Sequence, residues 1–209
     1  VKRVFASPYM LGICCFMLLY TALATFLYLV QAQVVAEASD DSATRTALFA
    51  WIDFSVNVLT IGIQITLTGR IISWLGVPLT LALIPILMAG GFMGLALAPM
   101  LPVLVAFQVM RRAGEYAIAR PAREVLFTVV DVETKYKAKN FIDTVVYRGG
   151  DAISSWIYAA LAALGLSLSG IAAIAVPIAM LLAAVGLGLG NRQEMLTKYA
   201  NADGKAVSR

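Results

Sequence analysis

A long apolar run near residue 50 carries a stripe of polar side chains. Asp53, Asn57, Thr60 and Gln64 are separated by four, three and four residues, which places all of them on one face of an α-helix. The other faces are apolar. Such a stripe can line a water-filled cavity, where Asp53 would take part in solute binding, or it can hydrogen-bond to neighbouring helices.

A second stripe combines both signs of charge. Gln108, Arg112 and Glu115 share one helical face, with Arg111 beside them. Two guanidiniums and one nearby carboxylate leave excess positive charge, which an anionic ligand would stabilise. We therefore expect Arg111 and Arg112 to neutralise an organic anion, and Asp53 and Glu115 to compete with it. Alternatively, Glu115 pairs with one of the arginines, or both arginines extend to the membrane surface.

A third group lies about thirty residues later in the chain. Tyr147 and Asp151 are one helical turn apart, and Arg148 lies between them. We expect these three residues at the mouth of the same binding site, although Arg148 and Asp151 could form only a local ion pair. A milder stripe, Thr21, Thr25 and Tyr28, is more typical of helix packing.

The composition defines the environment in which these side chains act. Hydrophobic residues make up 61% of the 209 residues and charged residues 13%. Soluble domains have roughly 45–50% hydrophobic and about 25% charged residues. The mean hydropathy of the chain is +0.85. The absence of histidine removes the usual metal ligand and general base. We expect no enzyme activity, no metal or cofactor and no nucleic-acid partner, and no phosphate-binding motif for ATP hydrolysis occurs.

The apolar runs predict an all-α, polytopic membrane protein. About 20 apolar residues span the hydrocarbon layer, and six runs of suitable length occur in residues 1–190, with a tail at 191–209. The predicted spans are residues 8–32, 46–69, 73–98, 101–125, 143–166 and 170–190.

Charge asymmetry predicts the topology. Fifteen of the sixteen Lys and Arg residues fall on one side of these six spans, and Arg45 alone falls on the other. Basic loops stay in the cytoplasm, so we expect both termini there, in a multi-pass protein of the bacterial inner membrane. Six spans of this orientation form one half of a twelve-helix bundle of the major facilitator type. The chain begins with Val and no signal peptide, so an amino-terminal six-helix half is an expected partner.

The segment from Arg120 to Asp151 resembles a loop and helix of the bacterial and plastid ATP/ADP translocases. The matching residues are Pro121, Arg123, Glu124, Lys135, Lys137, Lys139, Ile142, Asp143 and Arg148. The sequence departs from the family at Gly149-Gly150-Asp151, where Leu-Gly-Lys is expected. The resemblance implies nucleotide exchange, with ATP and ADP as cargo. It also implies a cytoplasmic gate formed by Arg120, Arg123, Glu124, Lys135, Lys137, Lys139 and Asp143.

These observations predict a secondary active transporter that moves an organic anion, such as a nucleotide, by exchange across the lipid bilayer. Two alternatives remain open. One is a proton-coupled facilitator for another small solute, in which Asp53 or Glu115 carries the proton. The other is a membrane scaffold that transports nothing and whose charged stripes only join helices.

Overall fold

A computed structural model describes residues 7–38, 41–130 and 132–207, and these residues form helices and short connections without a strand. The all-α expectation is confirmed. Lys2, Arg3 and Arg209, which contributed to the charge asymmetry, lie outside the described residues. In chain order the elements are α2 (Pro8–Ala38), α3 (Ser42–Thr66), α4 (Thr68–Leu97), α5 (Leu101–Gly114), η1 (Glu115–Ala119), α6 (Arg120–Leu126), α7 (Val132–Phe141), η2 (Ile142–Val146), α8 (Tyr147–Ala163) and α9 (Leu168–Val207).

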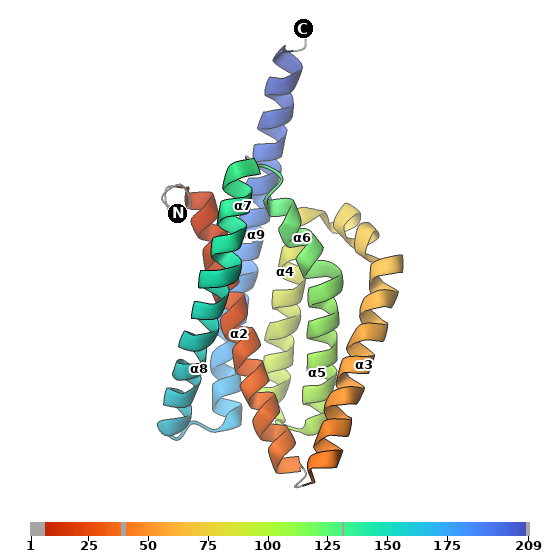
Figure 1. The fold of residues 1–209 in the computed structure, drawn as a ribbon, viewed down its shortest axis with the longest axis vertical. Coiled ribbons are helices and arrows are strands. Elements are labelled where there is room, and N and C mark those ends of the chain that lie inside the picture. The colour runs from red at the N-terminus through yellow and green to blue at the C-terminus, as the bar shows by residue number, and fades with distance from the viewer. Residues whose placement is uncertain (1–6, 39–40, 131, 208–209) are drawn as a thin grey trace.

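These elements make six rods in the described part of the chain. The elements α5, η1 and α6 run on without a break, as do α7, η2 and α8. Successive rods run in opposite directions, so the start of α2, the α6–α7 connection and the end of α9 lie at one end of the bundle (Figure 1).

Four of the described helices are long and apolar enough to cross a membrane. They are α2, α3, α4 and residues 168–199 of α9. The two remaining rods are α5–η1–α6 and α7–η2–α8, and each contains one π-helical turn. These rods carry most of the charged residues between positions 101 and 163. The helices are thus compatible with an integral membrane protein.

The helix ends reflect local chemistry. The Asp41 carboxylate accepts hydrogen bonds from the backbone N–H groups of Ala43 and Thr44, so α3 begins at Ser42. The helix α4 is broken at Gly76, whose φ of 71° suits glycine. The helix α9 does not end at residue 190 but continues to Val207 through most of the expected tail.

Small residues let α4 and α9 pack closely in the core. A Cβ atom added at Gly190 would lie 2.3 Å from the Pro78 Cα atom, and one at Gly186 would lie 3.3 Å from the Leu81 carbonyl oxygen. The backbones of the two helices therefore touch, as in other small-residue contacts between membrane helices. The helix α2 packs against α8 and α9, and it passes in front of the bundle centre (Figure 1).

Candidate solute-binding cavity

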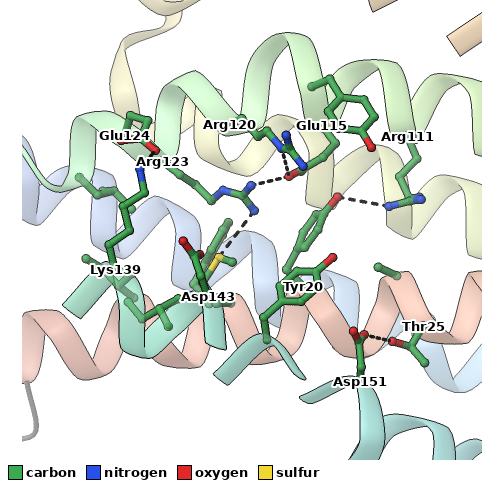
Figure 2. A pocket seen from close by; sticks show the side chains of 18 of the residues that line it. Tyr20, Thr25, Arg111, Glu115, Arg120, Arg123, Glu124, Lys139, Asp143 and Asp151 are labelled. Carbon is green, nitrogen blue, oxygen red and sulfur yellow. Dashed lines mark hydrogen bonds and ion pairs between the residues drawn. The ribbon is translucent and has the colours of Figure 1, made fainter. Parts of the chain in front are cut away.

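Three rods line an open cavity of about 820 Å³: α2, α5–η1–α6 and α7–η2–α8. This volume lies within the roughly 300–1,000 Å³ of small-molecule sites. The charged lining residues are Arg111, Arg112, Glu115, Arg120, Arg123, Glu124, Lys139, Asp143 and Asp151. The aromatic lining residues are Phe16, Tyr20, Tyr28, Tyr116, Phe127 and Tyr147. Figure 2 shows ten of the lining residues with labels.

Glu115 is the centre of the buried charge network. Arg123 Nη2 lies 2.5 Å from Glu115 Oε1, and Arg120 Nε lies 3.9 Å from the same oxygen (Figure 2). The second oxygen, Glu115 Oε2, is buried and accepts no hydrogen bond from the described residues. The guanidinium groups also contact aromatic rings, with Arg120 over Tyr116 at 4.5 Å and Arg123 over Tyr20 at 5.3 Å.

A second ion pair lies nearer the α6–α7 connection. Lys139 Nζ on α7 lies 2.5 Å from Glu124 Oε1 on α6. This pair joins the two rods across one end of the cavity, away from Arg111 (Figure 2). Both side chains are partly exposed, so the pair can open at small cost in free energy.

Arg111 is held by neutral groups. Its Nη1 donates to the Tyr20 hydroxyl at 3.3 Å, and its Nη2 and Nε donate to Gln108 Oε1 at 3.2 and 3.4 Å. Gln108 in turn donates to the Gln31 side chain. Within the described chain, no carboxylate lies within ion-pair distance of Arg111. The alternative in which Glu115 pairs with Arg111 or Arg112 is therefore wrong, because Glu115 is used by Arg123 and Arg120.

The two lining aspartates also lack a cationic partner among the described residues. Asp151 Oδ1 accepts a hydrogen bond of 2.7 Å from the Thr25 hydroxyl on α2. Asp143 has no hydrogen bond or ion pair to any side chain of the described ranges. The local Arg148–Asp151 pair does not occur among the ion pairs of the described residues. Arg148 is exposed and lies outside the cavity lining.

Both π-helical turns contribute an acid to the cavity. Glu115 is the first residue of η1, and Asp143 is the second residue of η2. A π turn inserts an extra residue into a helix and occurs frequently at functional sites. It also shifts the angular register of the next helical residues, which brings Arg120 and Arg123 to the same cavity as Arg111 and Arg112.

The polar stripe of α3 lies outside the cavity. Arg112 Nη1 pairs with Asp53 Oδ1 at 2.5 Å, and Gln64 Nε2 donates to the Tyr116 carbonyl at 3.2 Å. Asn57 is exposed, and Thr60 is buried with its hydroxyl unpaired among the described residues. The contacts of Asp53 and Gln64 join α3 to α5 and η1, so the structure favours interhelical bonding over cavity lining for this stripe.

The remaining predicted residues divide by position. Six of them line the cavity: Tyr147, Arg120, Arg123, Glu124, Lys139 and Asp143. Gln108 is not among the lining residues and accepts hydrogen bonds from Arg111. Lys135 and Lys137 lie on α7 outside the lining. The α2 residues Tyr20 and Thr25 were not predicted as ligands. The stripe of Thr21, Thr25 and Tyr28 was the available signal for this face of α2.

Comparisons with family models, with curated proteins and with solved structures give no match for this chain.

Proposed function

We propose that this chain is a half of a major-facilitator-type secondary transporter, with six spans and both termini in the cytoplasm of a bacterial inner membrane. In this proposal the cavity alternates between the two sides of the membrane and moves a small organic solute that bears an anionic group. An amino-terminal six-helix half would close the other side of the cavity.

The observation that carries the proposal is the state of Arg111. A charged group inside a membrane protein needs a partner, water or a ligand to offset its desolvation. Arg111 faces the cavity with hydrogen bonds only to the neutral side chains of Tyr20 and Gln108 within the described chain. A guanidinium held in this way can bind a carboxylate or phosphate in two-pronged geometry. This arrangement favours transport over a scaffold role.

The ion pairs toward the α6–α7 connection support a gate. Lys139–Glu124 joins α7 to α6, and Arg123–Glu115 joins α6 to η1. Opening of the first pair would separate the two rods at that end of the cavity, and re-formation would close it. Arg120 and Asp143 would take part as alternative partners for the released charges.

The sequence resemblance favours a nucleotide as the cargo, moved by exchange. The resemblance rests on the segment from Pro121 to Arg148. Four of its matching residues line the cavity: Arg123, Glu124, Lys139 and Asp143.

The test uses the full coding sequence that contains this chain, purified and placed in liposomes loaded with ADP. Uptake of labelled ATP is measured for the wild type, for Arg111→Gln and for Arg192→Gln, an equal charge change at an exposed residue outside the cavity. We expect uptake by the wild type and by Arg192→Gln, and at least a tenfold loss in Arg111→Gln. Equal uptake by both variants would remove Arg111 from the site, and absence of uptake by the wild type would overturn the nucleotide cargo.

Proton coupling is the second candidate, and Glu115 favours it. Its buried Oε2 has no hydrogen-bond partner in the described structure, and Glu115 lines the cavity. Asp53, the other predicted proton carrier, is exposed and paired with Arg112. Uptake driven by a pH gradient and lost in Glu115→Gln, without any requirement for internal ADP, would support this candidate over exchange.

A further inference from the structure

The charges of the cavity are nearly balanced, and this balance restricts the solute. Of the five cationic lining residues, Arg112, Arg123 and Lys139 each have a carboxylate partner at 2.5 Å, and Arg120 has one at 3.9 Å. Arg111 remains. Two acids, Asp143 and Asp151, line the same cavity without a cationic partner in the described chain. The cavity thus offers free charge of both signs.

A polyanion fits this balance poorly. A nucleotide with several phosphate charges would face Asp143 and Asp151. Besides Arg111 it would find only Arg120 without opening an ion pair, and Arg120 is 60% exposed and shares the Glu115 carboxylate with Arg123. Opening the exposed Lys139–Glu124 pair would release the Glu124 carboxylate beside the same solute. Arg123 and Glu115 are both largely buried, with side-chain exposures of 15% and 10%. Separating the Arg123–Glu115 pair would leave a buried charge without a partner, which is unfavourable. A solute with one negative and one positive group requires no such opening.

The two free charges both contact α2. Arg111 is bonded to Tyr20, and Asp151 is bonded to Thr25. Tyr20 and Thr25 are five residues apart, about 7.5 Å along the helix axis. Both charges also lie toward the same end of the cavity (Figure 2).

We propose that the solute is a small zwitterion, whose carboxylate or phosphate binds the Arg111 guanidinium and whose ammonium group binds the Asp151 carboxylate. The Thr25 hydroxyl orients the Asp151 carboxylate by a hydrogen bond of 2.7 Å. Asp143 is less suited to the ammonium, because it lies eight residues earlier on the same rod, about two helical turns away. The aromatic groups Tyr20, Tyr28 and Tyr147 line the remaining volume, where they can contact an apolar substituent. This inference rests on the proposed transport role of the same cavity and names its solute class.

The test compares solutes on the purified wild-type protein by thermal unfolding in detergent. The probes are an equimolar mixture of the twenty standard amino acids, phosphoethanolamine, the N-acetylated forms of both, and ADP. We expect stabilisation by one of the two zwitterionic probes, and apparent affinity at least tenfold weaker for the corresponding anion without an ammonium. The two zwitterionic probes distinguish a carboxylate from a phosphate at Arg111.

Two variants and two controls connect the result to the residues. Arg111→Gln should abolish stabilisation, and Asp151→Asn should remove the preference for the bound zwitterion over its N-acetylated form. Arg192→Gln and Glu37→Gln change exposed residues outside the cavity and should behave as the wild type. The comparison of probes on the wild type requires no variant and therefore does not depend on variant folding.

The outcomes separate this inference from the proposed function. Three outcomes would overturn the proposal of a zwitterionic solute. The first is stabilisation by ADP or by an N-acetylated probe that is as strong as stabilisation by the zwitterions. The others are an unchanged preference in Asp151→Asn and the absence of stabilisation by any probe. Exchange of ADP in liposomes without zwitterion binding would overturn it and leave the transporter intact. Binding of a zwitterion without its counterflow in liposomes would support this inference and overturn transport.

Discussion

The Arg112 guanidinium Nη1 lies 2.5 Å from the Asp53 carboxylate Oδ1 and joins α5 to α3. The helix α3 buries few of its residues: Ile52, Val56 and Thr60 are its buried positions in the described structure. The pair is therefore one of the contacts that join α3 to the rod that carries Arg111, together with the Gln64–Tyr116 hydrogen bond. It also removes Arg112 from the set of cations that are free to bind a solute.

The pair is partly exposed, with side-chain exposures of 31% for Arg112 and 56% for Asp53, so its contribution to stability should be small. We expect Asp53→Asn and Arg112→Gln each to lower the free energy of unfolding by about 1 kcal/mol or less. The double variant should cost no more than the larger single change, because both remove one interaction. Reversible unfolding in mixed detergent micelles measures this cycle, and strictly additive effects would show that the pair contributes nothing.

Burial should make the Glu115 pair far more important than the Glu124 pair. Glu115→Gln leaves the Arg123 guanidinium, with 15% side-chain exposure, without its carboxylate, and we expect a loss of about 3 kcal/mol. Glu124→Gln is the matched control, because Lys139 and Glu124 are 40% and 54% exposed, and it should cost about 1 kcal/mol or less. The same unfolding measurement applies to both. Equal losses in the two variants would contradict the assigned difference in burial effects.

The sequence predicted helices and polar faces better than partners. Periodicity placed Gln108, Arg111, Arg112 and Glu115 on one helix, and the structure brings the last three to one cavity. It could not predict that Glu115 pairs with Arg123 eight residues later. That contact depends on the π turn at η1, and a regular period of 3.6 residues gives no indication of an extra residue.

The face of α2 that completes the cavity was underestimated for a different reason. Tyr20 and Thr25 do not form a single polar stripe, and hydroxyl groups in membrane helices commonly serve packing. Their role depends on Arg111 and Asp151, which are 91 and 126 residues away in the chain. Likewise, the Asp53 stripe was a correct helical pattern, but only the placement of α3 beside α5 shows that Asp53 meets Arg112.

The cap of α3 should make the first turn of that helix sensitive to pH. A hydrogen bond from the Thr44 hydroxyl, together with those from the Thr44 and Ala43 backbone N–H groups, lowers the pKa of Asp41 below its usual value of about 3.9. The charged cap stabilises the first turn of α3 fully at pH values above that usual pKa. This stabilisation is lost as the pH falls through the lowered pKa. We expect hydrogen exchange at residues 43–46, corrected for intrinsic rates, to accelerate in that acidic range. Asp41→Asn keeps a capping oxygen without a charge and should abolish the acceleration. An identical pH response in Asp41→Asn would assign it to other groups.

The contact between α4 and α9 provides a test of the bundle that is independent of charge. A Cβ atom at Gly190 would lie 2.3 Å from Pro78 Cα and 2.6 Å from Pro78 N, so Gly190→Ala must separate two backbones. Overpacking of this kind costs typically about 1–3 kcal/mol. At Gly188, two residues earlier on α9, a Cβ atom meets nothing within 4 Å, and alanine is the better helix former by roughly 0.5–1 kcal/mol. Gly188→Ala should therefore leave the unfolding midpoint unchanged or raise it, whereas Gly190→Ala should lower it. If Gly190→Ala were as stable as the wild type, α4 and α9 would not pack backbone to backbone at Pro78.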